Sequence, residues 1–65
     1  MKQGDIFRTL RGTKNHVLKV LDEDDTVLIV FKWWRSGKQR WEYEVEPVWV
    51  VEQAIEICRI NKKGG

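Results

Sequence analysis

The chain contains few of the residues that commonly staple a small domain or hold a metal ion. It has one cysteine, one proline and one histidine in 65 residues. A single cysteine cannot form an intramolecular disulfide, and Cys58 and His16 alone cannot complete a Cys/His zinc site. Small secreted domains usually carry several disulfides, so a cytoplasmic location is expected. The longest apolar run, residues 27–31, is far too short to cross a bilayer, and the first residues lack the apolar core of a signal peptide.

The composition is that of one small globular domain. Hydrophobic residues make up 42% of the chain and charged residues 34%, and four tryptophans are present. A domain of this size buries only about 60% of the surface that its unfolded chain exposes, so most large side chains are needed for the core. The net charge of +2 conceals a segregation along the chain into basic and acidic blocks. We expect one basic face from this pattern.

Turn-forming residues divide the first 47 residues into four short segments. The turns fall at residues 11–15, 22–25 and 35–38 and at Pro47. The segments between them are rich in β-branched and aromatic residues and lie at about residues 5–10, 16–21, 26–34 and 40–46. This pattern predicts a mostly β (or α+β) fold, with an antiparallel meander of four to five strands.

The C-terminal segment shows helical spacing. Apolar or small residues recur on one side of a helix at Val51, Ala54, Ile55 and Cys58. This spacing predicts a short helix over about residues 51–61, with Cys58 as a small buried hydrophobe. The β-branched residues at the start leave open a strand over residues 48–51 that precedes a shorter helix. Residues 61–65 are expected to form a flexible tail.

The register of the hairpins can be predicted from the alternation of apolar and polar residues, because paired residues share a face of the sheet. A two-residue turn at Asp24 and Asp25 pairs Val20 with Ile29 and Leu18 with Phe31. A three-residue loop over residues 36–38 keeps the core apolar by pairing Trp33 with Trp41, Phe31 with Tyr43 and Ile29 with Val45. The other face then pairs Trp34 with Arg40, Lys32 with Glu42 and Val30 with Glu44. We therefore expect Trp33 and Trp41 in the core and Trp34 on the outer face.

A resemblance to a known fold group rests on several stretches of the chain. These are Gly4-Asp5-Ile6-Phe7-Arg8, Gly12, the apolar strand at residues 17–21, the acidic turn and the strand at residues 27–30. The pattern resembles small SH3-like β-barrel modules, among them KOW-type and Tudor-type domains and small proteins of bacteria and prophages. It covers about residues 4–50 and implies one SH3-like minidomain over residues 1–65. Such modules commonly bind nucleic acid or a short protein segment and are rarely enzymes.

Residues that could carry catalysis or hold a metal are few. Ser36 and His16 could contribute to a nucleophilic triad, but no G-x-S-x-G signature surrounds the serine. The acidic block at residues 22–25 lacks the spacing of a calcium-binding loop. Alternating glutamates at residues 42, 44 and 46 are typical of a solvent-facing edge strand. We expect no enzyme activity, no cofactor and no metal.

The hairpin over residues 32–41 is the candidate nucleic-acid site, because it interleaves tryptophans with lysines and arginines around a turn. An exposed tryptophan can stack a base, and neighbouring cations attract phosphate. The predicted site comprises Trp34, Arg35, Lys38 and Arg40, extended by Arg8, Arg11 and Lys14 from the first strand and turn. The alternative is that Arg40 covers Trp34 by a cation–π contact and the hairpin binds nothing.

A protein partner is the competing hypothesis. Tryptophan and arginine dominate the energetics of protein interfaces, and an apolar strip on the outer face would remain uncovered. The predicted interface comprises Leu28, Val30, Trp34, Glu42 and Glu44. It could serve a homodimer, or a small inhibitor or adaptor of the phage or prophage type, so the chain is expected to be a monomer or a homodimer.

Overall fold

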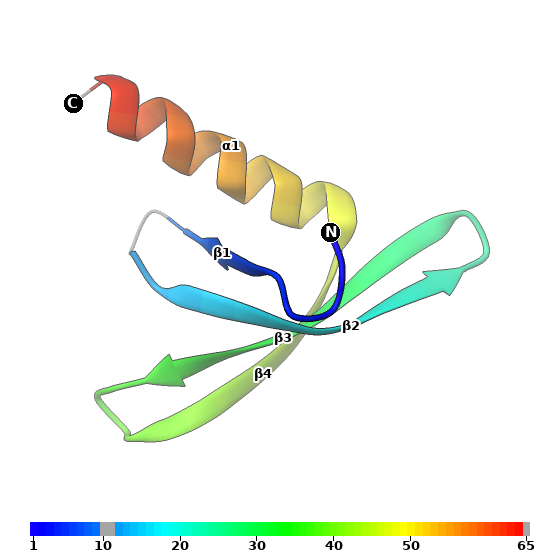
Figure 1. Cartoon of the computed structure of the whole chain (residues 1–65), viewed down its shortest axis with the longest axis horizontal. Helices are drawn as coiled ribbons and strands as arrows, with labels where there is room; N and C mark the ends of the chain where they lie inside the picture. Colours follow the sequence, from blue (N-terminus) through cyan, green and yellow to red (C-terminus); the bar gives the residue numbers. More distant parts are fainter. Residues whose placement is uncertain (10–11, 65) are drawn as a thin grey trace.

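The protein folds into one four-stranded antiparallel sheet followed by a long helix (Figure 1). The computed structural model describes residues 1–9 and 12–64, with only the backbone described at residues 62–64. The elements are β1 (Ile6–Arg8), β2 (Lys14–Glu23), β3 (Thr26–Arg35), β4 (Arg40–Pro47) and α1 (Val48–Gly64). The strands lie in the order β1-β2-β3-β4, each antiparallel to the next. The predicted meander with a C-terminal helix is confirmed at this level.

The sheet is open in the described residues, and it does not close into the barrel that the SH3-like resemblance implies. Strands β1 and β4 form its two edges, and β1 has only three residues with which to pair. The alternative strand at residues 48–51 is wrong, because helix α1 begins at Val48. Pro47 precedes it and has no N–H with which to continue a strand ladder. The helix reaches Gly64 and so includes most of residues 61–65, whose flexibility stays a prediction, while Gly65 lies outside the described residues.

The β2–β3 hairpin has the predicted turn and the predicted register near that turn, but its register differs from the prediction on the far side of Leu18. Val20 pairs with Ile29, as predicted, and Asp24 adopts a positive φ of 51° in the turn. The predicted pairing of Leu18 with Phe31 is wrong, because a β-bulge between Val17 and Lys19 shifts the register. Val17 pairs with Phe31 instead and is only 2% exposed. The bulge thus places Val17 in the core.

The β3–β4 hairpin differs from the prediction in every pair. Its turn spans the four residues 36–39, with Gln39 at a positive φ of 49°, so the register is shifted by one residue relative to the predicted three-residue loop. The N–H of Lys38 donates to the carbonyl of Arg35 at 3.1 Å inside this turn. The observed pairs are Arg35 with Arg40, Trp34 with Trp41, Trp33 with Glu42, Lys32 with Tyr43, Phe31 with Glu44, Val30 with Val45 and Ile29 with Glu46. A shift of one residue moves the apolar side of β4 to the opposite face of the sheet.

The core lies between the sheet and the first turns of α1. Its buried members are Phe7, Val17, Ile29, Phe31 and Val51. The rings of Phe7 and Phe31 meet edge to face at 5.1 Å, and Val48 and Ile55 of the helix pack against the cluster. Cys58 is half-buried, and its thiol lies 3.6 Å from the carbonyl of Thr9. This position differs from the full burial predicted for Cys58.

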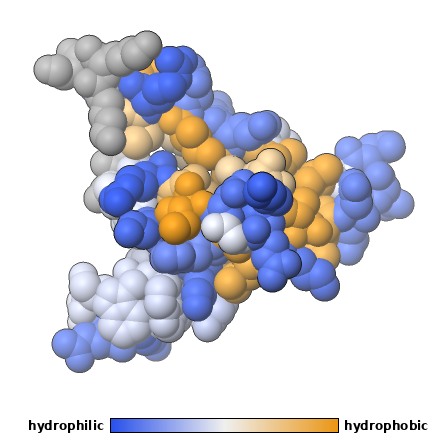
Figure 2. Space-filling view, in the orientation of Figure 1, coloured by the Kyte–Doolittle hydropathy of each residue, from blue (hydrophilic) through white to orange (hydrophobic). Residues whose placement is uncertain are grey.

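The two faces of the sheet are therefore unlike. The helix face carries the core residues of β1, β2 and β3 together with Glu42, Glu44 and Glu46 of β4. The open face is defined by Ile6 and Arg8 of β1, by Lys14, His16, Lys19, Leu21 and Glu23 of β2, by Thr26, Leu28, Val30, Lys32 and Trp34 of β3, and by Trp41, Tyr43, Val45 and Pro47 of β4. Figure 2 shows apolar residues gathered at the centre of the molecule, with hydrophilic residues at the β2–β3 turn. The end of β3 and the start of β4 extend away from the helix in Figure 1, so α1 covers only part of its face of the sheet.

Candidate nucleic-acid interface

The open face is built from cross-strand rows of side chains. Arg8 pairs with Lys14. Asn15 pairs with Trp33, so the next residues along the two strands, Lys14 and Trp34, lie beside each other on the open face. Trp34 in turn pairs with Trp41, which completes a row of two cations and two indoles across all four strands. The following row comprises Ile6, His16, Lys32 and Tyr43. Both rows lie at the end of the sheet that carries the β3–β4 turn.

Aromatic side chains form a cluster in these rows with Trp41 at its centre. The indole of Trp41 meets that of Trp34 at 5.4 Å and the imidazole of His16 at 5.6 Å, both edge to face. The Lys32 ammonium lies 4.3 Å from the centroid of the Trp41 ring, which is a cation–π contact. Tyr43 lies across from Lys32 and is 64% exposed. The predicted burial of Trp41 is wrong, because 38% of it is exposed, whereas Trp33 packs against the core.

The open face is basic over the rows nearest the β3–β4 turn. Arg8, Lys14 and Lys19 are exposed on it, and Lys32 is half-buried beside Trp41. Among the described strand residues that define this face, the one carboxylate is Glu23, which pairs with Thr26 beside the β2–β3 turn at the opposite end of the sheet. The glutamates of β4 point to the helix face, on the other side of the sheet. The open face is therefore cationic and aromatic together.

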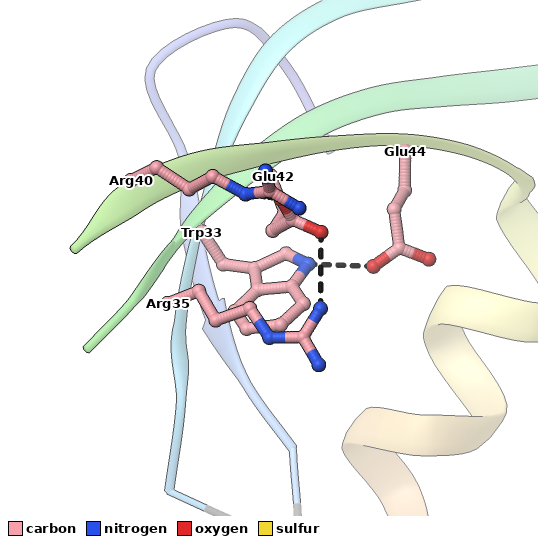
Figure 3. A network of polar contacts seen from close by, with 5 residues as sticks. All are labelled: Trp33, Arg35, Arg40, Glu42 and Glu44. Carbon is pink, nitrogen blue, oxygen red and sulfur yellow. Dashed lines mark hydrogen bonds and ion pairs between the residues drawn. The ribbon is translucent and has the colours of Figure 1, made fainter. Parts of the chain in front are cut away.

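On the helix face, Arg35 and Arg40 of the β3–β4 hairpin belong to a polar network (Figure 3). Glu42 accepts hydrogen bonds from Arg40 Nε at 2.8 Å and from Arg35 Nη1 at 3.3 Å. The indole N–H of Trp33 donates to the Glu44 carboxylate at 2.5 Å, and the Arg35 guanidinium lies 5.9 Å from the Trp33 ring centroid. These contacts offset the cost of placing carboxylates on the core side of β4. The helix does not cover this end of the hairpin, so the carboxylates also stay accessible to water.

The structure divides the residues that the sequence predicted for nucleic-acid binding. Trp34, Lys14 and Arg8 share one row of the open face. Arg35 and Arg40 lie on the helix face with Glu42, so the predicted neighbourhood of Trp34 and Arg40 is wrong. Lys38 is exposed in the turn, and Arg11 lies outside the described residues.

The predicted protein interface is divided in the same way. Leu28, Val30 and Trp34 belong to the open face, whereas Glu42 and Glu44 belong to the helix face. These five residues cannot form one continuous surface, because the sheet separates them. The apolar members still leave the open face rich in exposed hydrophobic groups, among them Ile6 and Val45.

Sequence reasoning placed Lys32 on the outer face but left it out of the candidate sites, together with Ile6, Lys19, Trp41, Tyr43 and Val45. The missing information was the length of the β3–β4 loop, which decides the side on which Trp41 and Tyr43 project. With four residues in the loop, the same alternation of aromatic residues and glutamates predicts the observed face. The composition of β4 fits either side, so the loop length had to come from the structure.

A concave feature lies on the helix face. An open cleft of about 400 Å³ separates α1 from the sheet. Its lining is mostly apolar and comes from both layers. Val50, Ala54 and Ile57 line it on the helix side, and the carboxylate-bearing Glu44 and Glu46 line it on the β4 side. The described residues contain no group of three or more His, Cys, Asp or Glu side chains placed to hold a metal ion. Nor is any helix in the described part of the chain long and apolar enough to span a membrane.

Comparisons of the chain with protein-family models, with curated proteins and with solved structures found no match.

Proposed function

We propose that the protein is a non-catalytic module that binds nucleic acid through the open face of its sheet. The observation that carries the proposal is the separation of charge by face. The cations of three strands lie with Trp34, Trp41 and Tyr43 on one side, and the glutamates of β4 lie on the other. The proposal does not depend on closure of the sheet into an SH3-like barrel.

Electrostatic attraction supplies the first part of the binding. Four cations, Arg8, Lys14, Lys19 and Lys32, are available to phosphate groups on the open face. Each phosphate neutralised on a single strand contributes about −0.7 to the slope of log K against log salt concentration. Four contacts predict a slope of about −3, which is a measurable signature of this surface.

Stacking on aromatic rings supplies the second part. Five of the large hydrophobic residues that are exposed in the structure belong to the open face, and three of them are Trp34, Trp41 and Tyr43. A sheet that presents rings between cations can hold bases against the rings while the backbone runs along the cations. Exposed aromatic area of this kind is costly in water unless a ligand covers it.

The test is fluorescence anisotropy of a labelled oligothymidylate titrated with the protein over a range of salt concentrations. The chain offers a matched pair of double variants, R8Q/K14Q on the open face and R35Q/R40Q on the helix face. Each pair removes two positive charges from the same end of the sheet. We expect R8Q/K14Q to weaken binding and to reduce the salt slope by about 1.4, and R35Q/R40Q to leave the slope within about 0.3.

Two results would contradict the proposal. The first is the absence of saturable binding at low salt by a folded wild-type protein. The second is an equal loss in both double variants, because a response to net charge alone would not identify the open face. Circular dichroism of each variant establishes that the fold is retained.

A protein partner is the second candidate for the same face. The specific observation in its favour is the apolar row of Leu21, Leu28 and Pro47, which continues the open face beyond Val30 and Val45. Sedimentation at moderate salt distinguishes this candidate. A concentration-dependent dimer that V45E disrupts would favour a homodimer, whereas a monomer at all concentrations would remove that form of the hypothesis.

A further inference from the structure

We infer that the open face selects single-stranded over double-stranded nucleic acid, with bases stacked on Trp34 and Tyr43 and with Trp41 as the support between them. This inference rests on the proposed function and adds to it a substrate class and separate roles for the three rings. The roles follow from the contacts that each ring already makes.

The ring of Trp41 is already occupied by neighbours. The Lys32 ammonium lies over its face, and the rings of His16 and Trp34 approach it edge to face. A base that stacked on the Lys32 side of Trp41 would have to displace this cation. Trp41 therefore holds the cluster in place and fixes the position of Lys32, and it is a positioning residue.

The rings of Trp34 and Tyr43 are the free ones. Trp34 is 47% exposed and Tyr43 is 64% exposed, which is more than Trp41 on the same face. Tyr43 lies two residues along β4 from Trp41, and Trp34 pairs with Trp41 across the strands. Diagonal neighbours of this kind have Cα atoms about 7–8 Å apart, so two side chains on this face can each hold a separate base.

Cations flank both free rings. Lys14 lies beside Trp34 in one row, and Lys32 lies across from Tyr43 in the next row. A strand that places one base on each ring brings its phosphates near these two ammonium groups. The arrangement matches the combination of stacking rings and a cationic track that holds single strands without reading their sequence.

A duplex cannot use the same rings. Its bases are stacked on one another and paired, so their faces are not available to Trp34 or Tyr43 unless the helix opens. Duplex phosphates can still reach Arg8, Lys14 and Lys19. Duplex binding is therefore expected to show a salt dependence but to gain nothing from the rings.

The experiment compares a labelled oligothymidylate with a labelled hairpin duplex, each titrated with the wild-type protein and with W34A, Y43A and Y43F. W49A is the matched control, because Trp49 is also an exposed tryptophan but belongs to α1, outside the strand rows that define the open face. W34A and Y43A are each expected to weaken single-strand binding by about tenfold or more and to leave duplex binding within about twofold. Y43F, which keeps the ring, and W49A are expected to stay within about twofold of the wild type for both ligands.

The salt slope separates failure of this inference from failure of the proposed function. If single strand and duplex bind equally and W34A and Y43A lose nothing, but R8Q/K14Q still reduces the slope, then stacking is wrong and the cationic face stands. If neither ligand binds, both proposals fail. A loss for W49A as large as that for W34A would also overturn the inference, because it would place stacking off the open face.

Discussion

Replacing valine by threonine at two strand positions tests which side of β4 faces the core. Val17 of β2 is 2% exposed, and Val45 of β4 is 53% exposed. The substitution keeps the β-branched shape at both positions, so strand propensity and volume change little. A hydroxyl buried without a partner costs about 1–3 kcal/mol, whereas an exposed substitution changes stability by about 0.5 kcal/mol or less. V17T is therefore expected to be much more destabilising than V45T.

The size of this difference is measurable in so small a domain. A chain of this length has a free energy of unfolding of about 3–10 kcal/mol, and a denaturant dependence of about 1 kcal/mol per molar urea is typical of the smallest domains. V17T should then lower the urea midpoint by about 1–3 M and V45T by less than about 0.5 M, as measured by tryptophan fluorescence and circular dichroism. An equal loss in V45T would refute the observed β3–β4 register, because Val45 would then share the core with Ile29.

Two further predictions concern local features of the chain. A hydrogen bond from Arg59 lowers the pKa of Glu56 below its ordinary value. This pair therefore stabilises the fold at pH values above the ordinary glutamate pKa, and the contribution is lost as the pH falls through the lowered pKa. In R59Q the pKa of Glu56, followed by NMR, is expected to rise to the ordinary value and the acid-side dependence of stability at this site to disappear. Gly12 has a φ of +77° and Gly37 has no positive φ, while a Cβ at either would meet nothing within 4 Å. G12A is therefore expected to destabilise the fold by about 1–2 kcal/mol through backbone strain alone. G37A is expected to be neutral or stabilising by up to about 1 kcal/mol. Thermal unfolding that showed the reverse order of stability would contradict the backbone conformations of these two glycines.

Local signals predicted the elements of this fold well. Residues 22–25 are acidic and lie between two β-branched runs, and the hairpin turn forms there with the predicted pair of Val20 and Ile29. The helical spacing of Val51, Ile55 and Cys58 likewise gave a helix, which begins three residues earlier than predicted. These features depend on residues that are close to one another in the sequence, so local sequence patterns are sufficient to predict them.

Register was less predictable because it depends on how far the helix covers the sheet. The prediction placed Tyr43 and Val45 toward the core because burial of apolar side chains is favourable. Glutamates on the core side of β4 would be costly only where another layer of the protein covers them. The end of the β3–β4 hairpin extends beyond α1, so Glu42 and Glu44 keep access to water and to hydrogen-bond donors in Arg35, Arg40 and Trp33. The bulge near Leu18 similarly has no clear signal in the sequence.

The length of the β3–β4 loop therefore decides the chemistry of the surface as well as the register. With a loop of three residues, Glu42 and Glu44 would share a face with Lys32 and Lys14, and their carboxylates would neutralise the cations and repel phosphate. With the observed four residues, the same glutamates lie behind the sheet, where Glu42 binds Arg35 and Arg40. The open face keeps its own cations and gains Trp41 and Tyr43 from the same shift. One residue in a turn thus moves the glutamates of β4 off the face that carries Lys14 and Lys32, which is why a near-neutral chain can present the cationic and aromatic surface on which the proposed function rests.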